Sequence, residues 1–260
     1  IKYYQIKMNT KKLIFSCACL LFALVGQAQT QVIAHRGFWK TEGSAQNSIT
    51  SLRKAAEAKV YGSEFDVQLT SDGVIVVNHD DTIDGFNIAQ TPYDKLKDLK
   101  LKNGEKLSTL ADYLKAGKQL NVQMILEIKP HKTKAQEDQI TEQTVKMVKE
   151  AGMEKQVEYI SFSMNVCEQL VRQTPDSKIS YLRSDVAPKQ LKEKGINGID
   201  YYYKVICQHP EWVKEAKDLG MKVNVWTVDD IADMKEMLDL NVDYITTDEP
   251  LKAASLIAGK

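Results

Sequence analysis

The feature of this sequence that most constrains its fold is a regular alternation of short β-branched runs with amphipathic helical segments. Such alternation is typical of βα units built around a parallel sheet. The expected strands span residues 32–35, 63–68, 74–79, 123–129, 158–162, 178–182, 198–202, 222–227 and 244–247. The expected helices span residues 49–58, 109–116, 136–151, 166–173, 188–194, 211–219 and 231–238.

About eight such units in a chain of 260 residues predict a single-domain (β/α)8 TIM barrel, with an open doubly wound sheet as the alternative. Nine expected strands exceed the eight places of the barrel. The turn Thr70-Ser71-Asp72-Gly73 joins two runs that lie too close for a helical crossover, so we expect a hairpin there. The hairpin would set Asp66 opposite Asn78 and His79. We expect residues 80–108, which are polar and irregular, to form a short insertion after it at the barrel mouth.

Residues 8–28 carry the pattern of a secretory signal. Lys11 and Lys12 form a short basic region, residues 13–25 are apolar, and Gly26-Gln27-Ala28 supplies small residues for a cleavage site. The apolar stretch is short for a membrane span, although an uncleaved anchor helix is the alternative. We therefore expect residues 1–28 to be a signal peptide, with 1–7 as an upstream extension, and residues 29–260 to form the domain. Such a protein is exported, either to the periplasm or out of the cell.

Composition excludes some classes of partner. Lys and Arg together number 35, as do Asp and Glu, so the formal net charge is zero. Binding to nucleic acid needs a basic excess, so we expect a small-molecule substrate and no nucleic-acid partner. Beyond residue 28 no apolar run is long enough to span a membrane. The two cysteines of that part, Cys167 and Cys207, either pair or stay free, and no zinc-binding pattern is present. The sequence leaves the oligomeric state open.

Two of the expected strands end in acidic side chains. Glu64 and Asp66 point to one face because alternate residues of a strand do, and Glu127 likewise shares a face with Lys129. Active sites of these barrels lie at the carboxyl ends of the strands, so the acids should converge. Converging carboxylates stay ionised when a cation neutralises them, and hard oxygen ligands indicate Mg²⁺ or Ca²⁺. The alternative is that each acid pairs with a Lys or Arg.

Basic and aromatic residues also stand at the ends of expected strands. His35 and His79 at one mouth suit general acid–base catalysis near neutral pH. Arg36 and Lys129 beside a divalent cation indicate an anionic substrate, since Arg binds phosphate in a bidentate manner. Their alternative role is to neutralise the acids. Trp226 is either an apolar wall for the substrate or a core residue.

Taken together and in this order, these residues resemble the glycerophosphodiester phosphodiesterase family. The motifs that carry the resemblance are His35-Arg36-Gly37, Gln46-Asn47-Ser48, Glu64-Phe65-Asp66-Val67, Thr70-Ser71-Asp72-Gly73, His79-Asp80, Glu127-Ile128-Lys129, Ser161-Phe162, Val225-Trp226-Thr227-Val228 and Ile245-Thr246-Thr247-Asp248. The similarity runs from about residue 32 to residue 250. It implies a TIM-barrel phosphodiesterase that depends on a divalent metal.

The resemblance also implies a reaction and a role for each residue. The roles are metal binding for Glu64, Asp66 and Glu127, acid–base catalysis for His35 and His79, and substrate binding for Arg36, Lys129 and Trp226. In the implied reaction the neighbouring glycerol hydroxyl attacks phosphorus, and water then opens the resulting cyclic phosphate.

The chain departs from the family pattern at two places. The family usually has Glu-Asn-Thr where this chain has Gln46-Asn47-Ser48, and Gln cannot supply a negative charge. We expect Gln46 and Asn47 to support the metal ligands through hydrogen bonds, in which case activity survives with altered tuning. If the Gln46 position were a direct ligand, the affinity for metal would change. The loop after His79 contains Ile83-Asp84-Gly85 instead of the usual Arg-Thr-Thr.

The expected function is metal-dependent hydrolysis of glycerophosphodiesters to glycerol 3-phosphate and an alcohol. One alternative is a lysophospholipase D or a phosphoinositide-type phosphodiesterase, for which Phe38 and Trp39 would supply an apolar strip. A different class is a catalytically silent barrel that binds phosphodiesters or sugars, which the Gln46 substitution favours.

Overall fold

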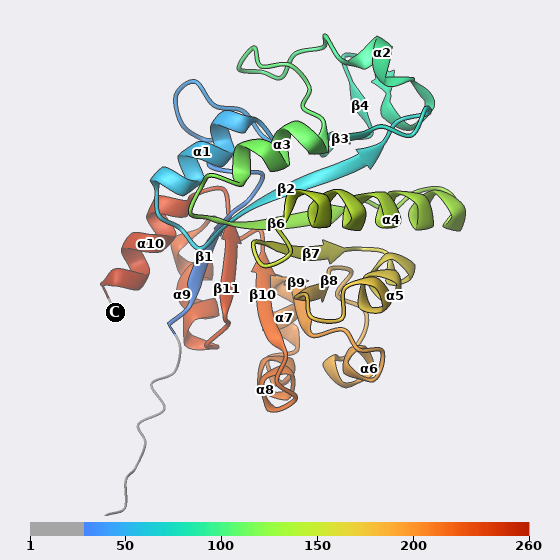
Figure 1. Ribbon diagram of the computed structural model, residues 1–260. Coiled ribbons are helices and arrows are strands. Elements are labelled where there is room, and N and C mark those ends of the chain that lie inside the picture. Colours follow the sequence, from blue (N-terminus) through green and yellow to red (C-terminus); the bar gives the residue numbers. More distant parts are fainter. Residues whose placement is uncertain (1–28, 260) are drawn as a thin grey trace, which may run out of the picture.

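Eight parallel strands close into a ring because the first of them pairs with both the second and the last. The computed structural model describes residues 29–259 and shows this ring as a TIM barrel (Figure 1). In chain order the ring strands are β1 (Gln31–Ala34), β2 (Gly62–Leu69), β6 (Gln123–Ile128), β7 (Val157–Ser161), β8 (Ile179–Tyr181), β9 (Gly198–Tyr202), β10 (Lys222–Trp226) and β11 (Tyr244–Thr247). Closure is set where Ile33 pairs with Gly62 of β2 and with Thr246 of β11.

Helices cover the outside of the ring. They are α1 (Ile49–Glu57), α3 (Leu110–Gly117), α4 (Lys134–Ala151), α5 (Met164–Gln173), α6 (Pro188–Glu193), α7 (Tyr203–Gln208), α8 (Glu211–Asp218), α9 (Ile231–Asp239) and α10 (Pro250–Ala258). Several begin at a polar side chain that accepts a backbone N–H, such as Ser48 before α1 and Thr133 before α4. The sequence predicts all of them except α7 and α10. The first of these follows β9 without a loop and has no side-chain cap, so no start signal marks it.

Side chains of the ring strands alternate between two cores. Outward residues such as Phe65, Leu126 and Val223 pack against the helices in the larger core. Inward residues such as Ile125 and Ile160 fill the barrel. This alternation places every second residue of a strand inside the ring, where it either packs with its neighbours or faces the mouth.

The ninth strand leaves the ring as predicted. β3 (Ile75–Val77) runs antiparallel to β2, and the amide N–H of Asn78 donates to the carbonyl oxygen of Asp66 at 3.0 Å. The insertion that follows contains β4 (Thr82–Ile83), β5 (Phe86–Asn87), a 3₁₀ turn (Ile88–Gln90) and α2 (Tyr93–Leu96). It lies beyond the arrowhead of β2 (Figure 1).

The insertion is more ordered than its sequence indicates. It has a small apolar cluster of its own, formed by Val76, Ile83, Ile88, Leu96 and Leu107. These residues are scattered among polar ones without a helical or strand period, which is why the segment resembles an irregular loop in sequence. The cluster fastens the insertion to β3 and thereby fixes the end of the hairpin at the barrel mouth.

The described residues form the single domain that the sequence predicts, whereas the expected signal peptide, residues 1–28, lies outside them. Within residues 29–259 no helix has both the length and the apolar character needed to cross a membrane. Cys167 and Cys207 are free thiols, so the pairing that the sequence left open does not occur.

Gly37, in the loop between β1 and α1, allows this loop to lie against the helix. Its φ is +78°, and a Cβ atom there would come within 2.6 Å of Ser51 Cβ and 2.7 Å of the Ser51 backbone carbon. Gly43, in the same loop, has a similar φ of +73°, but no atom of the described residues lies within 4 Å of the place that its Cβ atom would take. Substitution of Gly37 would therefore cause both a steric clash and backbone strain, whereas substitution of Gly43 would cause backbone strain alone.

We expect Gly37→Ala to lower the free energy of unfolding by roughly 3 kcal/mol, because overpacking adds to the cost of a positive φ. Gly43→Ala should cost about 1 kcal/mol, from the backbone alone. Urea titrations of both variants and the wild type measure the difference. Equal losses for the two variants would show that α1 moves away without cost.

Candidate active site

The barrel mouth begins with the turn that follows β1. Arg36 and Gly37 have positive φ values of 53° and 78°, so the chain reverses immediately after the barrel. The amide of His35 still donates to the carbonyl oxygen of Thr247 at 3.0 Å, as the last bond of this ladder. The reversal points the backbone N–H of Arg36 at Glu64 Oε2, 2.7 Å away.

Gln46 and Asn47, at the far end of the same loop, orient their neighbours. Asn47 Nδ2 donates to Asp66 Oδ2 at 2.9 Å, and Asn47 Oδ1 accepts from the Asp66 amide at 3.1 Å. Gln46 Oε1 accepts a hydrogen bond from Arg36 Nη1 at 2.9 Å. Asn47 thus holds a carboxylate in place, whereas Gln46 holds a guanidinium.

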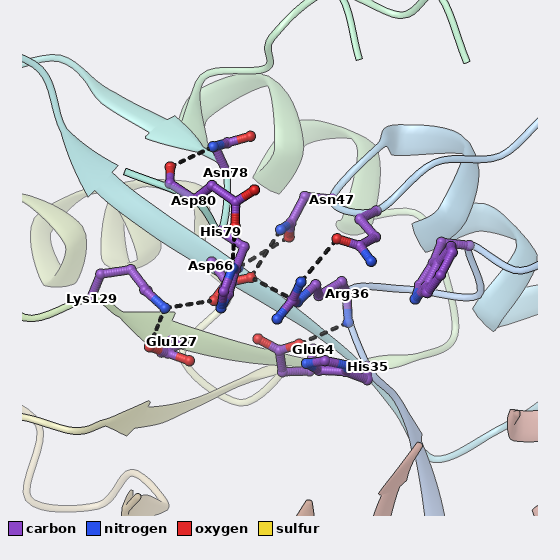
Figure 2. Close-up of polar contacts among 12 residues, drawn as sticks. His35, Arg36, Asn47, Glu64, Asp66, Asn78, His79, Asp80, Glu127 and Lys129 are labelled. Atoms are coloured by element: carbon purple, nitrogen blue, oxygen red, sulfur yellow. Dashed lines mark hydrogen bonds and ion pairs between the residues drawn. The ribbon is translucent and has the colours of Figure 1, made fainter. Parts of the chain in front are cut away.

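Glu64, Asp66 and Glu127 form a buried carboxylate cluster. Asp66 on β2 is paired with Glu127 on β6, and Glu64 lies two residues earlier on the same face of β2. Oxygens of all three lie within 4.8 Å of one another, and no residue of the three is more than 6% exposed. Figure 2 shows Asp66 at the centre, between Lys129 on one side and Asn47 on the other.

Burial and mutual repulsion disfavour the ionised forms of two of these acids. Burial, with the charges of Asp66 and Glu127 added, raises the pKa of Glu64 well above its ordinary value. Burial and the charge of Asp66 raise the pKa of Glu127 to about 8. Burial acts on Asp66 too, but Lys129 and other nearby positive groups outweigh it and hold the pKa of Asp66 below its ordinary value.

Two cationic side chains lie against the cluster. Lys129 Nζ is 3.6 Å from Asp66 Oδ1 and 3.3 Å from Glu127 Oε1, and Arg36 Nε is 3.9 Å from Asp66 Oδ2. Ion pairs with Lys129 and Arg36 therefore offset part of the negative charge of the acids. This agrees in part with the alternative expectation from the sequence, in which each acid pairs with a Lys or Arg. Buried Glu127 Oε1 nevertheless has no hydrogen-bond partner within the described chain. An all-oxygen set with such an oxygen fits a hard divalent cation such as Mg²⁺ or Ca²⁺.

Each of the two histidines has a carboxylate on the same ring nitrogen. His35 Nδ1 lies 2.8 Å from Asp248 Oδ1, and His79 Nδ1 lies 2.7 Å from Asp80 Oδ1. Because a carboxylate accepts the Nδ1 proton, Nε2 of each neutral ring is left to take up a proton. Burial lowers the pKa of His79 against the opposing charge of Asp66, which favours the neutral ring.

A cavity of about 90 Å³ joins these groups at the mouth. Ionisable residues on or next to the first strands line one side, namely His35, Arg36, Glu64, His79 and Glu127. Apolar residues from later strands line the other, namely Ile160, Phe162, Leu182 and Trp226. The Trp226 ring packs edge-on against Phe162 with centroids 5.5 Å apart. The structure thus places Trp226 in the wall rather than in the outer core.

All residues that the sequence predicts for the site lie in this one region. They are His35, Arg36, Gln46, Asn47, Glu64, Asp66, His79, Glu127, Lys129 and Trp226. His131 lies near them but is held by the backbone. Its Nδ1 donates to the carbonyl oxygen of Lys129 at 2.8 Å, and its Nε2 accepts from the Leu69 amide at 3.1 Å. With both nitrogens occupied, His131 is a structural residue.

Two acidic residues of the region escape prediction from the sequence. Asp248, the partner of His35, also accepts from Trp39 Nε1 at 2.9 Å. Burial opposes its ionisation, but these two hydrogen bonds hold the pKa of Asp248 below its ordinary value. Its position directly after β11 is a signal that could have identified it. Asp200 lies in the middle of β9, so the rule that sites lie at strand ends does not find it.

Comparison with known proteins agrees with this geometry. Residues 35–252 match the model of the glycerophosphoryl diester phosphodiesterase family. A glycerophosphodiester phosphodiesterase of Caldanaerobacter subterraneus is 31% identical over 246 residues, which are 88% of this chain and 98% of the relative.

Solved structures show the same fold. The crystal structure of a glycerophosphodiester phosphodiesterase from Parabacteroides distasonis has a TM-score of 0.89 and 51% identity, and the match covers 90% of this chain and 99% of that one. A phosphodiesterase from Oleispira antarctica, solved in complex with the product sn-glycerol-3-phosphate, has a TM-score of 0.78 at 24% identity, with coverage of 88% and 97%.

In the metal-free protein, Glu127→Gln should raise the free energy of unfolding at pH 8 and change it little at pH 4. The pKa of Glu127 is about 8 in the folded state against 4.5 for the unperturbed group. Between these values the folded protein holds a proton that the unfolded chain releases, so this carboxyl lowers stability as pH rises. Its removal should gain a few kcal/mol at pH 8.

Urea titrations from pH 4 to pH 9 with a chelator present measure this dependence. The matched control is Glu158→Gln, because Glu158 is a barrel acid that already accepts from Tyr61 and Lys178. This control should lose stability at pH 8. A gain for Glu127→Gln that does not vary with pH would contradict the electrostatic explanation.

Proposed function

Because the chain belongs to the glycerophosphodiester phosphodiesterase family and is a phosphoric diester hydrolase, we propose that it releases glycerol 3-phosphate and an alcohol in a reaction that requires a divalent cation. The observation that carries this proposal is the convergence of two carboxylate-bonded histidines on the cavity that borders the buried acids. The Oleispira antarctica phosphodiesterase, which shares the fold, is described with sn-glycerol-3-phosphate as its product.

Glu64, Asp66 and Glu127 would hold the cation, which on binding would neutralise the acids and offset charge on the phosphate oxygens. The chain prepares this cluster through its neighbours. Asn47 fixes Asp66 by two hydrogen bonds, and the turn after β1 fixes Glu64 through the amide of Arg36. Preset ligands need little rearrangement when the cation binds.

Arg36 and Lys129 are proposed to bind the phosphate. Arg36 is on the cavity wall, and its Nε has no hydrogen-bond partner among residues 29–259, although it is buried. Gln46 holds one end of the guanidinium and leaves that Nε available. A neutral Gln suits this task, since it orients the cation without pairing with its charge. The bond goes to Arg36 and not to one of the three acids, so Gln46 would act on the phosphate-binding group and not directly on the metal ligands, as the sequence had led us to expect.

His35 and His79 are proposed to move the protons. One ring takes the proton from the attacking glycerol hydroxyl as its oxygen bonds to phosphorus, and the other gives a proton to the departing alcohol as its bond breaks. Water then opens the cyclic phosphate with the same two groups in reversed roles. In each ring the carboxylate on Nδ1 favours Nε2 as the reacting nitrogen and stabilises the imidazolium that forms.

The contacts favour this function over the alternatives. The alternative of a lysophospholipid substrate required Phe38 and Trp39 to form an apolar strip at the mouth. In the structure Phe38 packs against the larger core, and Trp39 donates a hydrogen bond to Asp248. A silent binding barrel has no use for two oriented histidines on one cavity. We also propose that the chain acts after export; residues 8–28, with Lys11 and Lys12 before an apolar stretch, support this.

The proposal predicts metal-dependent release of glycerol 3-phosphate from glycerophosphocholine and glycerophosphoethanolamine. Protein stripped of metal should be inactive and should recover with Mg²⁺ or Ca²⁺. His35→Ala and His79→Ala should each lose about 10²–10⁴-fold in kcat, the usual contribution of acid–base catalysis. His209→Ala is the matched control, because His209 stacks on Trp212 and is not among the residues that line the cavity. Equal turnover by all three variants would contradict the assignment of His35 and His79 as the acid–base pair.

Asp248 is a positioning residue, and its role predicts a separate result. Asp248→Asn should lower kcat by about 10–100-fold and change KM little, because the His35 ring loses the charge that fixes its tautomer. Glu249→Gln is the control, since Glu249 pairs with Lys40 and makes no bond to His35. A fall in thermal stability with unchanged kcat would show that Asp248 serves only the fold.

A further inference from the structure

Asp200 is a buried carboxyl that the proposed mechanism does not use. It lies on β9 between Ile199 and Tyr201, which face outward into the larger core, so Asp200 faces into the barrel. It is 2% exposed and lines the active-site cavity. It also borders a smaller cavity of about 20 Å³ on the inner side. Asp200 therefore forms part of the cavity floor.

Asp200 lacks the partners that a buried carboxyl normally has. Its Oδ1 has no hydrogen-bond partner within the described residues. The two lysines that line the inner cavity are already paired, Lys178 with Glu158 and Lys222 with Asp243. Burial, opposed only by the Asn224 amide, raises the pKa of Asp200 to about 7. An unpartnered carboxyl in such a place costs stability, so a ligand is the natural source of the missing bond.

The position of Asp200 in the ring indicates which part of a ligand reaches it. In the strand order, β9 stands opposite β2, which carries Glu64 and Asp66. A phosphate held by Arg36 and Lys129 on the side of these acids would leave its organic substituent to extend toward Asp200. The walls between are apolar, with Ile160 and Leu182 among them.

The size of the cavity limits that substituent. About 90 Å³ is well below the several hundred Å³ of pockets that enclose drug-sized ligands. That volume accommodates a three-carbon group with hydroxyls, whereas the rest of a diester would extend out through the mouth. Its carbon atoms would contact the apolar wall, and the carboxyl would bond to a hydroxyl. The proposed attack by a glycerol hydroxyl also requires the glycerol side of the diester to be the enclosed one.

We propose that Asp200 is a specificity-determining residue that binds a hydroxyl group of the substrate's glycerol moiety at the floor of the cavity. The inference rests on the proposed function for the substrate class. Near neutral pH the carboxyl can accept a hydrogen bond from a hydroxyl or, when protonated, donate one to it. Its backbone carbonyl separately accepts from Trp226 Nε1 at 2.9 Å, so replacing the side chain leaves that contact in place.

Calorimetric titration of the purified protein at saturating Mg²⁺ tests the proposal without turnover. The ligands are sn-glycerol 3-phosphate, methyl phosphate and phosphocholine. The wild type should bind glycerol 3-phosphate more tightly than methyl phosphate. Asp200→Ala should weaken glycerol 3-phosphate about tenfold or more and methyl phosphate less than twofold, since one ligand has the hydroxyls and the other lacks them. Asp200→Asn, which can still bond to a hydroxyl, should keep part of the preference.

Glu158→Gln is the matched control, a change to another barrel acid that should leave all three affinities unchanged. Thermal unfolding separates binding from folding, because Asp200→Asn removes an unpartnered carboxyl and should not lower Tm. Three results would overturn the proposal: no preference for glycerol 3-phosphate in the wild type, equal weakening of both phosphate esters, or a loss confined to phosphocholine. Because only binding is measured, absence of turnover in the activity assay leaves this result intact.

Discussion

The repulsion among three buried carboxylates is the constraint to which the rest of the barrel mouth responds. Glu64, Asp66 and Glu127 bring their oxygens within 4.8 Å of one another, and all three side chains are buried. Ionised acids at such a site need positive charge or hydrogen-bond donors close by. Lys129 approaches two of them, and the amide of Arg36 approaches the third. These groups do not offset all the negative charge of the three ionised acids, and the charge that remains makes the site suitable for a divalent cation.

The loop between β1 and α1 exists in its unusual conformation to meet that requirement. Arg36 and Asn47 both adopt positive φ, which is uncommon for residues with a side chain. The amide of Asn47 donates to the carbonyl oxygen of Arg36 at 3.0 Å, so the two strained positions support each other. Strain of this kind persists where the surroundings over-determine the backbone. Here it aims one amide and one carboxamide at two different acids.

Much of the site could be predicted from the sequence because strand ends are local features. His35 and Glu127 each stand at the end of an apolar run, and Glu64 shares a strand face with Asp66. Parallel strands deliver their carboxyl ends to one mouth whatever lies between them. The hairpin was equally local, since the turn after Thr70 left no room for a crossover. Asp248 directly follows a strand, so the same strand-end rule could have identified it.

Other features depend on contacts that no local sequence pattern marks. The bond from Arg36 to Gln46 decides how the departure from the family pattern is interpreted, yet nothing in the spacing of these residues indicates which way either side chain points. The order of the insertion comes from Ile83, Ile88 and Leu96 packing onto β3, a cluster without sequence periodicity. Helix α7 lacks a capping residue and forms where the chain leaves β9.

Two acids inside the barrel that lie outside the carboxylate cluster, Glu158 and Asp200, show how function can be separated from folding. Glu158, toward the amino ends of the strands, accepts from Lys178 at 2.7 Å, and Tyr61 and Tyr244 complete that cluster. Asp200, toward the mouth, has an oxygen with no partner in the described chain. Both positions face the same interior and carry the same chemical group, so the barrel is able to satisfy a buried carboxyl where stability alone matters. A chain that leaves one unsatisfied beside a cavity retains it for a molecule that enters.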